Sequence, residues 1–566
     1  MARLSKKFSG LALCLLLSAL GSLCPLFPVL PAQAAQEKTR LDDKADMTLI
    51  EHLSDGQENV SWKGKAGEDK GAARLPLDLD AGTYVAGQVP QAGDTLVLEL
   101  IDADGKLLRR LIGPESDRKS FNILITEDAR YITASSVRGE TDFTVEITQN
   151  VMPLLEQQDT GSSPLMSPKL GDLQQTLKDG GTADAFWQAI SETGTPMVEP
   201  GPDGDYIVTF LYRGARQNVR IMGAPSANHD WMSHLDGSDI WYRSYRVPAE
   251  TRLSYRLAPD VPDVPGSFWQ KRVAILATAQ QDPLNKRSWP ADALDKFSTK
   301  SVLELPKAPE QPFVVPRDSA SGSIESFDFS SEDLGNSRKI TLYKPAGFKP
   351  DDPDTLLLVL FDSTPYQVDV PTPVILDNMH ADGVLPQTVA VLIANPDLKS
   401  RSRELPDNKA FSKAVAREIL PRAQKLLGVR VSPERTILAG SSYGGLASTR
   451  IALEYPDVFG NVISLSGSYW WNPKGTPGKD QEYTAGRVAS QEKQPVRFFL
   501  ATGLFERGQD GSPDILATNR HLRTVMEARG YDVTFREYAA SHDYIYWQGA
   551  LSDGLLALFG QDNMKD

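Results

Sequence analysis

Residues 437–447 decide the fold of this chain, and they read Ile-Leu-Ala-Gly-Ser-Ser-Tyr-Gly-Gly-Leu-Ala. An apolar, strand-like run leads into Gly-x-Ser-x-Gly, and a helix-forming stretch follows. This order is typical of a nucleophile elbow, in which glycines allow a sharp turn that holds a serine hydroxyl above the end of a sheet. The N-terminus of the following helix would face any developing oxyanion. The pattern therefore predicts that Ser442 is a nucleophile in a domain built of strands and helices.

The remainder of the C-terminal part alternates short apolar runs with helix-forming segments. The expected strands are 356–361, 388–393, 435–439 and 496–501, and the expected helices lie around 411–427, 444–455 and 515–529. Such alternation favours a parallel sheet with helices on both faces. We therefore assign residues 313–566 to an α/β catalytic domain with the layout of an α/β-hydrolase.

The first 34 residues have the features of a cleaved export signal. Three basic residues precede an apolar run at 11–23, and small residues follow up to Ala35. We expect cleavage after Ala34 and a periplasmic or secreted protein. Both cysteines, Cys14 and Cys24, lie in this segment, so the mature chain would have neither a disulfide nor a cysteine-based metal site.

Charge and hydropathy limit the partners of the mature chain. The formal net charge is −14, and it becomes −17 when the three basic residues of the signal are removed. Such an acidic chain is a poor partner for nucleic acid. No stretch after the signal is long and apolar enough to span a bilayer, and the oligomeric state is open.

Two β-rich regions are expected between the signal and the catalytic domain. Residues 36–72 are polar, charged and glycine-rich, and we expect a mobile arm there. Alternating runs over 73–150, with a hairpin turn at 102–105, predict a small β-sandwich that resembles the jelly-roll-like prepeptidase modules of secreted bacterial enzymes. A second β domain is expected at 165–312, with a helical segment at 184–190 before its first strand at 206–212.

The general base is expected downstream of the serine, because α/β-hydrolases place their triad in the order Ser, acid, His. Of six histidines, only His521 and His542 follow Ser442. His521 lies in an amphipathic helix at 515–529, which favours a surface or packing role. His542 comes directly after an apparent strand at 533–538, in a loop that would lie above the sheet edge. We therefore expect His542 to be the base.

The acid that would orient His542 is expected in the loop after the fourth strand. Glu506, Asp510 and Asp514 all lie there. Asp514 would also suit a helix N-terminus and Asp510 a turn, so Glu506 is the preferred candidate. Its carboxylate would fix the tautomer of His542 and stabilise the imidazolium that forms.

An oxyanion hole would complete the site. The backbone N–H of Tyr443, the residue after the nucleophile, should be one donor, and the loop 362–366 should supply the second. Pro365 has no N–H, so Ser363 or Thr364 is the expected second donor.

Several motifs resemble those of the enterochelin (enterobactin) esterase family. In the catalytic domain they lie at 375–378, 395–397, 401–405, 465–471 and 542–551. In the preceding β domain they lie at 239–244, 255–257, 282–285 and 302–306. The resemblance covers about 170–560 and implies an Ig-like β-sandwich, the N-terminal domain of such esterases, in front of the α/β-hydrolase domain.

The resemblance implies hydrolysis of the serine trilactone of a catecholate siderophore such as enterobactin, free or ferric, so that iron can be released. Ser442 would be the nucleophile and His542 the base. Glu506 matches an acidic position in the family's Gly-x-x-Glu stretch, although some exported members work with a Ser-His dyad. No cofactor and no metal site are expected, and iron would be present only in the substrate complex.

A ferric tris-catecholate is large, flat-faced and trianionic, so cationic and aromatic side chains would bind it. The candidates are Arg401 and Arg403 for the charge, and Trp470, Trp471 and Trp547 for stacking on the catechol rings. Two alternatives stay open. Arg401 would pair with Glu404 at helical spacing, and one of the two adjacent tryptophans would pack in the core.

The chain also departs from the best-known two-domain members, which lack an export signal and act in the cytosol. Hydrolysis outside the inner membrane would precede transport of the siderophore. A general exported carboxylesterase of the feruloyl or acetyl-xylan type, and an acyltransferase of the mycolyl-transfer type, would have the same elbow. A siderophore-binding protein with a vestigial site is the non-enzymatic alternative.

Overall fold

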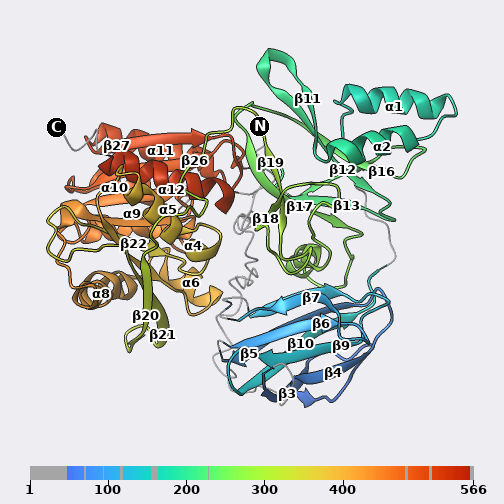
Figure 1. Cartoon of the computed structure of the whole chain (residues 1–566), viewed down its shortest axis with the longest axis horizontal. Helices are drawn as coiled ribbons and strands as arrows, with labels where there is room; N and C mark the ends of the chain where they lie inside the picture. Colours follow the sequence, from blue (N-terminus) through green and yellow to red (C-terminus); the bar gives the residue numbers. More distant parts are fainter. Residues whose placement is uncertain are drawn as a thin grey trace, which may run out of the picture.

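The computed structural model describes residues 47–68, 72–93, 95–114, 116, 119–154, 163–226, 229–477, 482–508 and 513–560. The expected signal at 1–34 lies outside these ranges. Three bodies are visible in Figure 1: a β-domain in blue, a β-rich domain in green next to it, and an α/β domain in yellow to red beside the green one.

The first domain is a pair of five-stranded sheets with the orders β1-β3-β10-β5-β8 and β2-β4-β9-β6-β7. Its strands are β1 (Thr48–Leu49), β2 (Leu53–Ser54), β3 (Val60–Ala66), β4 (Ala73–Asp78), β5 (Tyr84–Ala92), β6 (Leu96–Ile101), β7 (Leu107–Ile112), β8 (Ser120–Leu124), β9 (Tyr131–Ser136) and β10 (Thr141–Val151). Apolar side chains from both sheets meet in one buried cluster.

The prediction of a mobile arm at 36–72 is wrong for the residues that the structure describes. Residues 48–66 contain β1 to β3, and β3 pairs with β10 over seven residues. Trp62 is buried, with its ring centroid 4.7 Å from that of Phe143. The strand was hidden in the sequence because Gly64 and Ala66, which follow Trp62 on the inward face, are small.

The middle domain consists of a four-stranded sheet, β11-β12-β16-β15, and a five-stranded sheet, β14-β13-β17-β19-β18. Its strands are β11 (Met197–Pro200), β12 (Tyr206–Arg213), β13 (Val219–Met222), β14 (Asp230–Trp231), β15 (Ser233–His234), β16 (Ile240–Val247), β17 (Arg252–Pro259), β18 (Ser288–Trp289) and β19 (Lys300–Glu304). Its helices are α1 (Pro168–Lys178), α2 (Asp184–Thr193) and α3 (Phe268–Val273), and the 3-10 turns are η2 (Pro202–Gly204) and η3 (Ala274–Ala277).

One apolar cluster fills the space between the two middle sheets, and a second lies between the four-stranded sheet and helices α1 and α2. The helix expected at 184–190 is the N-terminal part of α2. The first domain is attached to the middle domain by Arg109, which donates to the carbonyls of Ala277 and Leu276 at 2.7 and 3.0 Å.

The catalytic domain has an eight-stranded mixed sheet with the order β20-β21-β23-β22-β24-β25-β26-β27. The strands are β20 (Ser323–Ser331), β21 (Asn336–Lys344), β22 (Leu356–Phe361), β23 (Thr388–Ile393), β24 (Thr436–Ser441), β25 (Asn461–Leu465), β26 (Arg497–Gly503) and β27 (Asp532–Tyr538). The β20–β21 hairpin is antiparallel, and the strands from β23 to β27 pair in parallel.

Helices cover both faces of this sheet, which confirms the expected α/β arrangement. They are α4 (Pro365–Val368), α5 (Thr372–Ala381), α6 (Leu398–Glu404), α7 (Lys409–Ala414), α8 (Leu420–Leu427), α9 (Tyr443–Glu454), α10 (Tyr483–Ser490), α11 (Ile515–Ala528) and α12 (Tyr544–Phe559), with η4 (Val415–Ile419) and η5 (Pro433–Arg435) as π and 3-10 turns. Along β22, Leu357 and Val359 face one apolar cluster, whereas Leu358 and Leu360 face the other.

The single helix expected at 411–427 is divided into α7, the π turn η4 and α8. Pro421 lies in the first turn of α8 and has no N–H to donate to the preceding turn, which explains the interruption.

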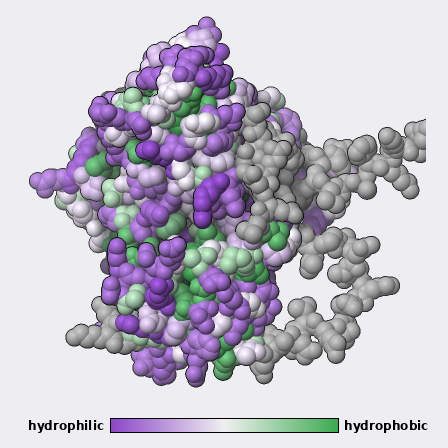
Figure 2. Space-filling view, turned by 90° about the vertical axis from the view of Figure 1, so that its right-hand side faces the viewer, coloured by the Kyte–Doolittle hydropathy of each residue, from purple (hydrophilic) through white to green (hydrophobic). Residues whose placement is uncertain are grey.

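The side of the molecule drawn in Figure 2 is mainly hydrophilic, with smaller hydrophobic areas. Within the described ranges, no helix combines the length and the apolar character needed to cross a membrane.

Candidate active site

Ser442 lies in a sharp turn between β24 and α9. Its φ and ψ are 57° and −120°, a conformation that is strained for a residue with a side chain. Close packing forces the turn to use glycines on either side. A Cβ on Gly440 would lie 2.7 Å from the carbonyl carbon of Gly444, and one on Gly445 would lie 2.6 Å from Ser464 Oγ. Packing therefore requires glycine at positions 440 and 445, whereas a Cβ on Gly444, the second glycine of the motif, would approach Asp362 Oδ2 no closer than 3.4 Å.

Backbone hydrogen bonds hold the turn against the loop after β25. The N–H of Ser442 donates to the carbonyl of Leu465 at 2.9 Å, and the N–H of Ser468 donates to the carbonyl of Ser442 at 3.1 Å. Ser442 Oγ is 3.3 Å from Ser468 Oγ, and Ser442 is only 2 % exposed. The candidate nucleophile is thus fixed in a protected position.

His542 and Glu506 form a buried pair at the same edge of the sheet. His542 Nδ1 is 2.8 Å from Glu506 Oε1, and both side chains are almost fully buried. The second carboxylate oxygen of Glu506 accepts hydrogen bonds from Thr502 Oγ1 at 2.8 Å and from the Gly503 N–H at 3.0 Å. This arrangement favours the tautomer with the proton on Nδ1, so that Nε2 is left as a proton acceptor.

The His542 Nε2 atom is buried and has no hydrogen-bond partner among the described residues. The ring packs edge-on against Trp547 with a centroid distance of 4.8 Å. Trp547 donates from its indole N–H to Ser466 Oγ at 3.0 Å. Ser466 comes directly after Leu465, whose carbonyl accepts from the Ser442 N–H. Trp547 is itself 0 % exposed, so the prediction that it stacks on a substrate ring is wrong.

Arg401 is buried and forms a bidentate ion pair with Asp362, with N–O distances of 2.7 and 2.8 Å. Asp362 also accepts from Asn395 Nδ2 at 2.5 Å. The alternative pairing of Arg401 with Glu404 is wrong, because Glu404 pairs with Arg338 at 2.7 Å. Since Asp362 neutralises the guanidinium, the hypothesis that Arg401 screens the charge of a substrate is not supported. Its contacts are with the loop after β22 and with Tyr443, whose ring centroid lies 5.7 Å from the guanidinium carbon.

The other expected binding residues lie nearer to solvent. The Arg403 side chain is 54 % exposed. Trp470 is half-buried, and its ring lies 6.0 Å from that of Tyr443, the residue after the nucleophile. Trp471 packs against an apolar cluster of the catalytic domain and lies edge-on to Tyr483. Trp470 therefore lies closer to the elbow, while Trp471 takes the packing role that was expected for one of the pair.

The two expected donors of the oxyanion hole lie at the start of α9 and in the loop after β22. Tyr443, whose backbone N–H is one of the expected donors, is the first residue of α9. The N–H of Ser363 donates to the carbonyl of Ile393 at 3.2 Å, so Ser363 is not a suitable second donor. Thr364, the other expected donor, remains the candidate, and it lies two residues after Asp362, which has a φ of 57°.

The remaining sequence candidates have other roles. His521 is exposed on α11 and pairs with Glu482. Asp514 caps α11 by accepting from the Ala517 N–H at 2.7 Å. Asp510 lies outside the described residues. Of the three candidate acids, Glu506 is the one that the structure brings to His542.

Sequence reasoning missed three residues of the site. Thr502 and Ser466 come at the ends of β26 and β25, so their places at strand ends were the only available signal. Asp543, next to His542, contacts residues that are more than 200 positions earlier. No local pattern could have indicated that contact.

Two family models match the chain. The model of the N-terminal domain of enterochelin esterase matches residues 207–314, and a putative esterase model matches residues 331–558. The iron(III) enterobactin esterase of Dickeya dadantii is 29 % identical over 449 residues, with 73 % of this chain and 98 % of the relative covered. The iron(III) salmochelin esterase of Escherichia coli is 30 % identical, with 69 % and 98 % covered.

Solved structures agree with these relatives. The ferric enterobactin esterase of Salmonella typhimurium has a TM-score of 0.54 at 27 % identity, and 66 % of this chain and 98 % of that chain are covered. The enterobactin esterase of Shigella flexneri, crystallised with 2,3-dihydroxy-N-benzoyl-serine, has a TM-score of 0.52 at 28 % identity and the same coverage. Because the relatives are matched along nearly their whole length, through the middle domain as well as the catalytic domain, the chain belongs to the enterochelin esterase family of carboxylic ester hydrolases.

Proposed function

We propose that this protein is an exported serine esterase that hydrolyses the trilactone ester bonds of a catecholate siderophore such as enterobactin, free or ferric, for iron release. The observation that carries the proposal is the buried pair of His542 and Glu506, with 2.8 Å between Nδ1 and Oε1, at the edge of the sheet that carries the Ser442 elbow. The relatives that match through both domains are named iron(III) enterobactin esterase and iron(III) salmochelin esterase.

In this mechanism Ser442 Oγ attacks a lactone carbonyl while His542 Nε2 takes the hydroxyl proton. The N–H groups of Tyr443 and Thr364 stabilise the oxyanion. The tetrahedral intermediate collapses to an acyl-enzyme, and the serine hydroxyl of the siderophore leaves with the proton from His542. A water molecule then attacks the acyl-enzyme, gives one proton to His542, and Ser442 is restored as the acid is released.

The substrate would bind beside the elbow. Trp470 and Tyr443 offer adjacent aromatic rings for catechol groups, and Arg403 offers an exposed cation for the negative charge of a ferric complex. The reaction as proposed uses no resident cofactor or metal, and iron enters only with the substrate.

We also propose that the chain is exported by cleavage of residues 1–34 and acts in the periplasm or outside the cell. Esters would then be cut before the siderophore crosses the inner membrane. The paired sheets of the first and middle domains support the interpretation of these domains as jelly-roll-like and Ig-like sandwiches, respectively. Cell fractionation followed by N-terminal sequencing of the mature protein tests export.

Chromatography of enterobactin, free and iron-loaded, after incubation with residues 35–566 tests the activity. We expect the wild type and the control Ser490→Ala, which changes a serine at the end of α10, to give linear trimer, dimer or monomer of dihydroxybenzoylserine. Ser442→Ala should leave the trilactone intact. Intact trilactone with the wild type, together with turnover of simple aryl esters, would instead indicate a general carboxylesterase. Ester transfer to an added alcohol would indicate an acyltransferase.

A further inference from the structure

The loop that carries His542 is bound by the middle domain. It joins β27 to α12, and the residue on each side of His542 has its side chain in contact with the middle domain. Ser541 Oγ donates to the carbonyl of Ala224 at 2.8 Å. At the start of the loop, the N–H of Arg252 donates to the carbonyl of Ala539 at 3.1 Å. The position of the base therefore depends on a second domain.

Asp543 makes the strongest of these contacts. Its Oδ1 accepts from Lys300 Nζ at 2.9 Å. Its Oδ2 accepts from the Ser254 N–H at 3.2 Å and from Ser254 Oγ. The Lys300 and Asp543 side chains are 8 % and 3 % exposed, and Lys300 also lies 4.9 Å from the centroid of the Trp289 ring. We call Ser254, Lys300 and Asp543 the interdomain latch.

The backbone around Asp543 shows that its carboxylate is used for the latch instead of for local structure. Asp543 is the N-cap residue of α12, but its side chain makes no capping hydrogen bond. An aspartate at an N-cap normally accepts from a backbone N–H of the first turn of the helix, which stabilises the helix. Here both carboxylate oxygens face the middle domain, so the local cap is replaced by contacts between domains.

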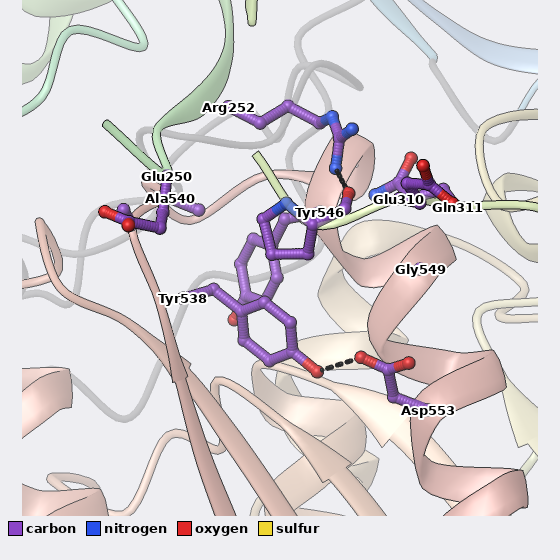
Figure 3. A pocket seen from close by; sticks show the side chains of 11 residues that line it. Glu250, Arg252, Glu310, Gln311, Tyr538, Ala540, Tyr546, Gly549 and Asp553 are labelled. Atoms are coloured by element: carbon purple, nitrogen blue, oxygen red, sulfur yellow. Dashed lines mark hydrogen bonds between the residues drawn. The ribbon is translucent and has the colours of Figure 1, made fainter. Parts of the chain in front are cut away.

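The partner of the base is held in the same way. Phe505, which precedes Glu506, packs against the apolar cluster between the two middle sheets. A cavity lies on the other side of the His542 loop, lined by Glu250 and Arg252 from the middle domain and by Tyr538 and Ala540 from the catalytic domain. In Figure 3 Tyr538 bonds to Asp553, and Arg252 bonds to the carbonyl of Pro309. Gln311, which also lines the cavity, donates to the carbonyl of Ile545 in α12 at 2.8 Å. The latch adds a charged contact to the hydrogen bonds and the packing that already hold this loop.

From these contacts we propose that Lys300 and Ser254 are positioning residues for the ester hydrolysis, which act through Asp543 to hold His542 in line with Ser442. The inference rests on the proposed roles of Ser442 and His542, and it holds for any ester that they hydrolyse. It makes the middle domain a part of the catalytic apparatus. A displacement of about 1 Å in a catalytic group can lower a rate about 100-fold, so a small shift of the loop is sufficient.

The test compares Lys300→Met, Lys300→Arg and the control Lys307→Met, which changes an exposed lysine of the same region. The assay measures kcat and KM with enterobactin and with p-nitrophenyl butyrate, a small neutral ester. We expect Lys300→Met to lower kcat about 10- to 100-fold on both esters, with KM within about twofold. Lys300→Arg, which keeps the charge, should recover most of the rate, and the control should match the wild type.

A second pair of variants separates positioning from a general loss of structure. In a His542→Ala background, Lys300→Met should not lower the residual rate further, because no base remains to be positioned. A further loss there, or an effect of Lys300→Met no larger than its unfolded fraction, would overturn the latch. An equal effect with Lys300→Arg would also contradict it. A wild type that cuts p-nitrophenyl butyrate but not enterobactin would refute the siderophore substrate alone, and a wild type inactive on both esters would overturn both proposals.

Discussion

Replacing Glu506 with glutamine should harm catalysis more than replacing it with alanine. In the wild type, Glu506 Oε2 accepts from the Gly503 N–H at 3.0 Å and from Thr502 Oγ1 at 2.8 Å. In Glu506→Gln the amide oxygen must take this place, because a backbone N–H can only donate. The NH₂ group then faces His542 Nδ1. The imidazole would have to carry its proton on Nε2, where it cannot accept a proton from Ser442.

The size of the effect follows from these contacts. The productive tautomer of His542 carries its proton on Nδ1. With that tautomer, the amide NH₂ of the variant side chain would face either the Nδ1–H of His542 or, if the amide is turned over, the Gly503 N–H. In both cases two buried donors would face each other without an acceptor. Each unpaired buried donor costs about 1–3 kcal/mol, which gives about 4 kcal/mol for the two. That corresponds to about a 1,000-fold loss in kcat/KM for Glu506→Gln. In Glu506→Ala a water molecule can occupy the space and permit either tautomer, so we expect a loss of only about 10- to 100-fold.

The assay is kcat/KM for p-nitrophenyl butyrate and for enterobactin, with the folded fraction checked by circular dichroism. A matched control is Glu482→Gln, because Glu482 pairs with His521 on the exposed surface in a similar way. We expect that control to stay within twofold of the wild type. Glu506→Gln within tenfold of the wild type, or less harmful than Glu506→Ala, would refute the tautomer argument and favour a Ser-His dyad.

Two more predictions concern binding and pH. Trp470→Ala removes a ring beside Tyr443. The loss of one aromatic contact, worth about 0.5–1.5 kcal/mol, should raise KM for enterobactin about 2- to 10-fold more than KM for a small acetyl ester. Equal changes in the two KM values would exclude a role of Trp470 in stacking. Burial, with the nearby charges of Arg272 and Arg220, holds the pKa of His229 well below its ordinary value of 6.5. The folded state thus favours the neutral ring, so its stability is complete above about pH 6.5 and falls as the pH is lowered further. Melting temperatures between pH 7.5 and 5 should fall more for the wild type than for His229→Gln, and parallel curves would contradict this assignment.

The features that the sequence predicted correctly depend on neighbours in the chain. The elbow needs glycines because atoms within a few residues, and the adjacent strand, leave no space for a Cβ at Gly440 and Gly445. The strands of the catalytic sheet are short apolar runs because both faces are covered, and such runs are visible without any tertiary information. His542, the expected base, was selected by its place after a strand, together with the order of the triad in α/β-hydrolases, and the structure places it beside Glu506.

The predictions that failed depended on contacts across the fold. Trp547 and Arg401 look like binding residues in the sequence, but one lies in the core beside His542 and the other pairs with Asp362 at the end of a different strand. Strand β3 was missed because its inward positions after Trp62 are small, and the aromatic ring that completes the packing, Phe143, comes from β10.

The chain itself therefore specifies a serine elbow, a histidine after the last strand and a choice of three acids, because each is a local pattern of residue types. Only the folded molecule selects Glu506 among the acids, since a 2.8 Å contact with His542 requires the ends of two strands to be brought together. It also decides the environment of the base. The carboxylate of Asp543 meets its cation and its hydroxyl in residues 300 and 254. An ion pair removed from water needs good geometry and further hydrogen bonds to offset the desolvation of both charges, and only the folded interface supplies them.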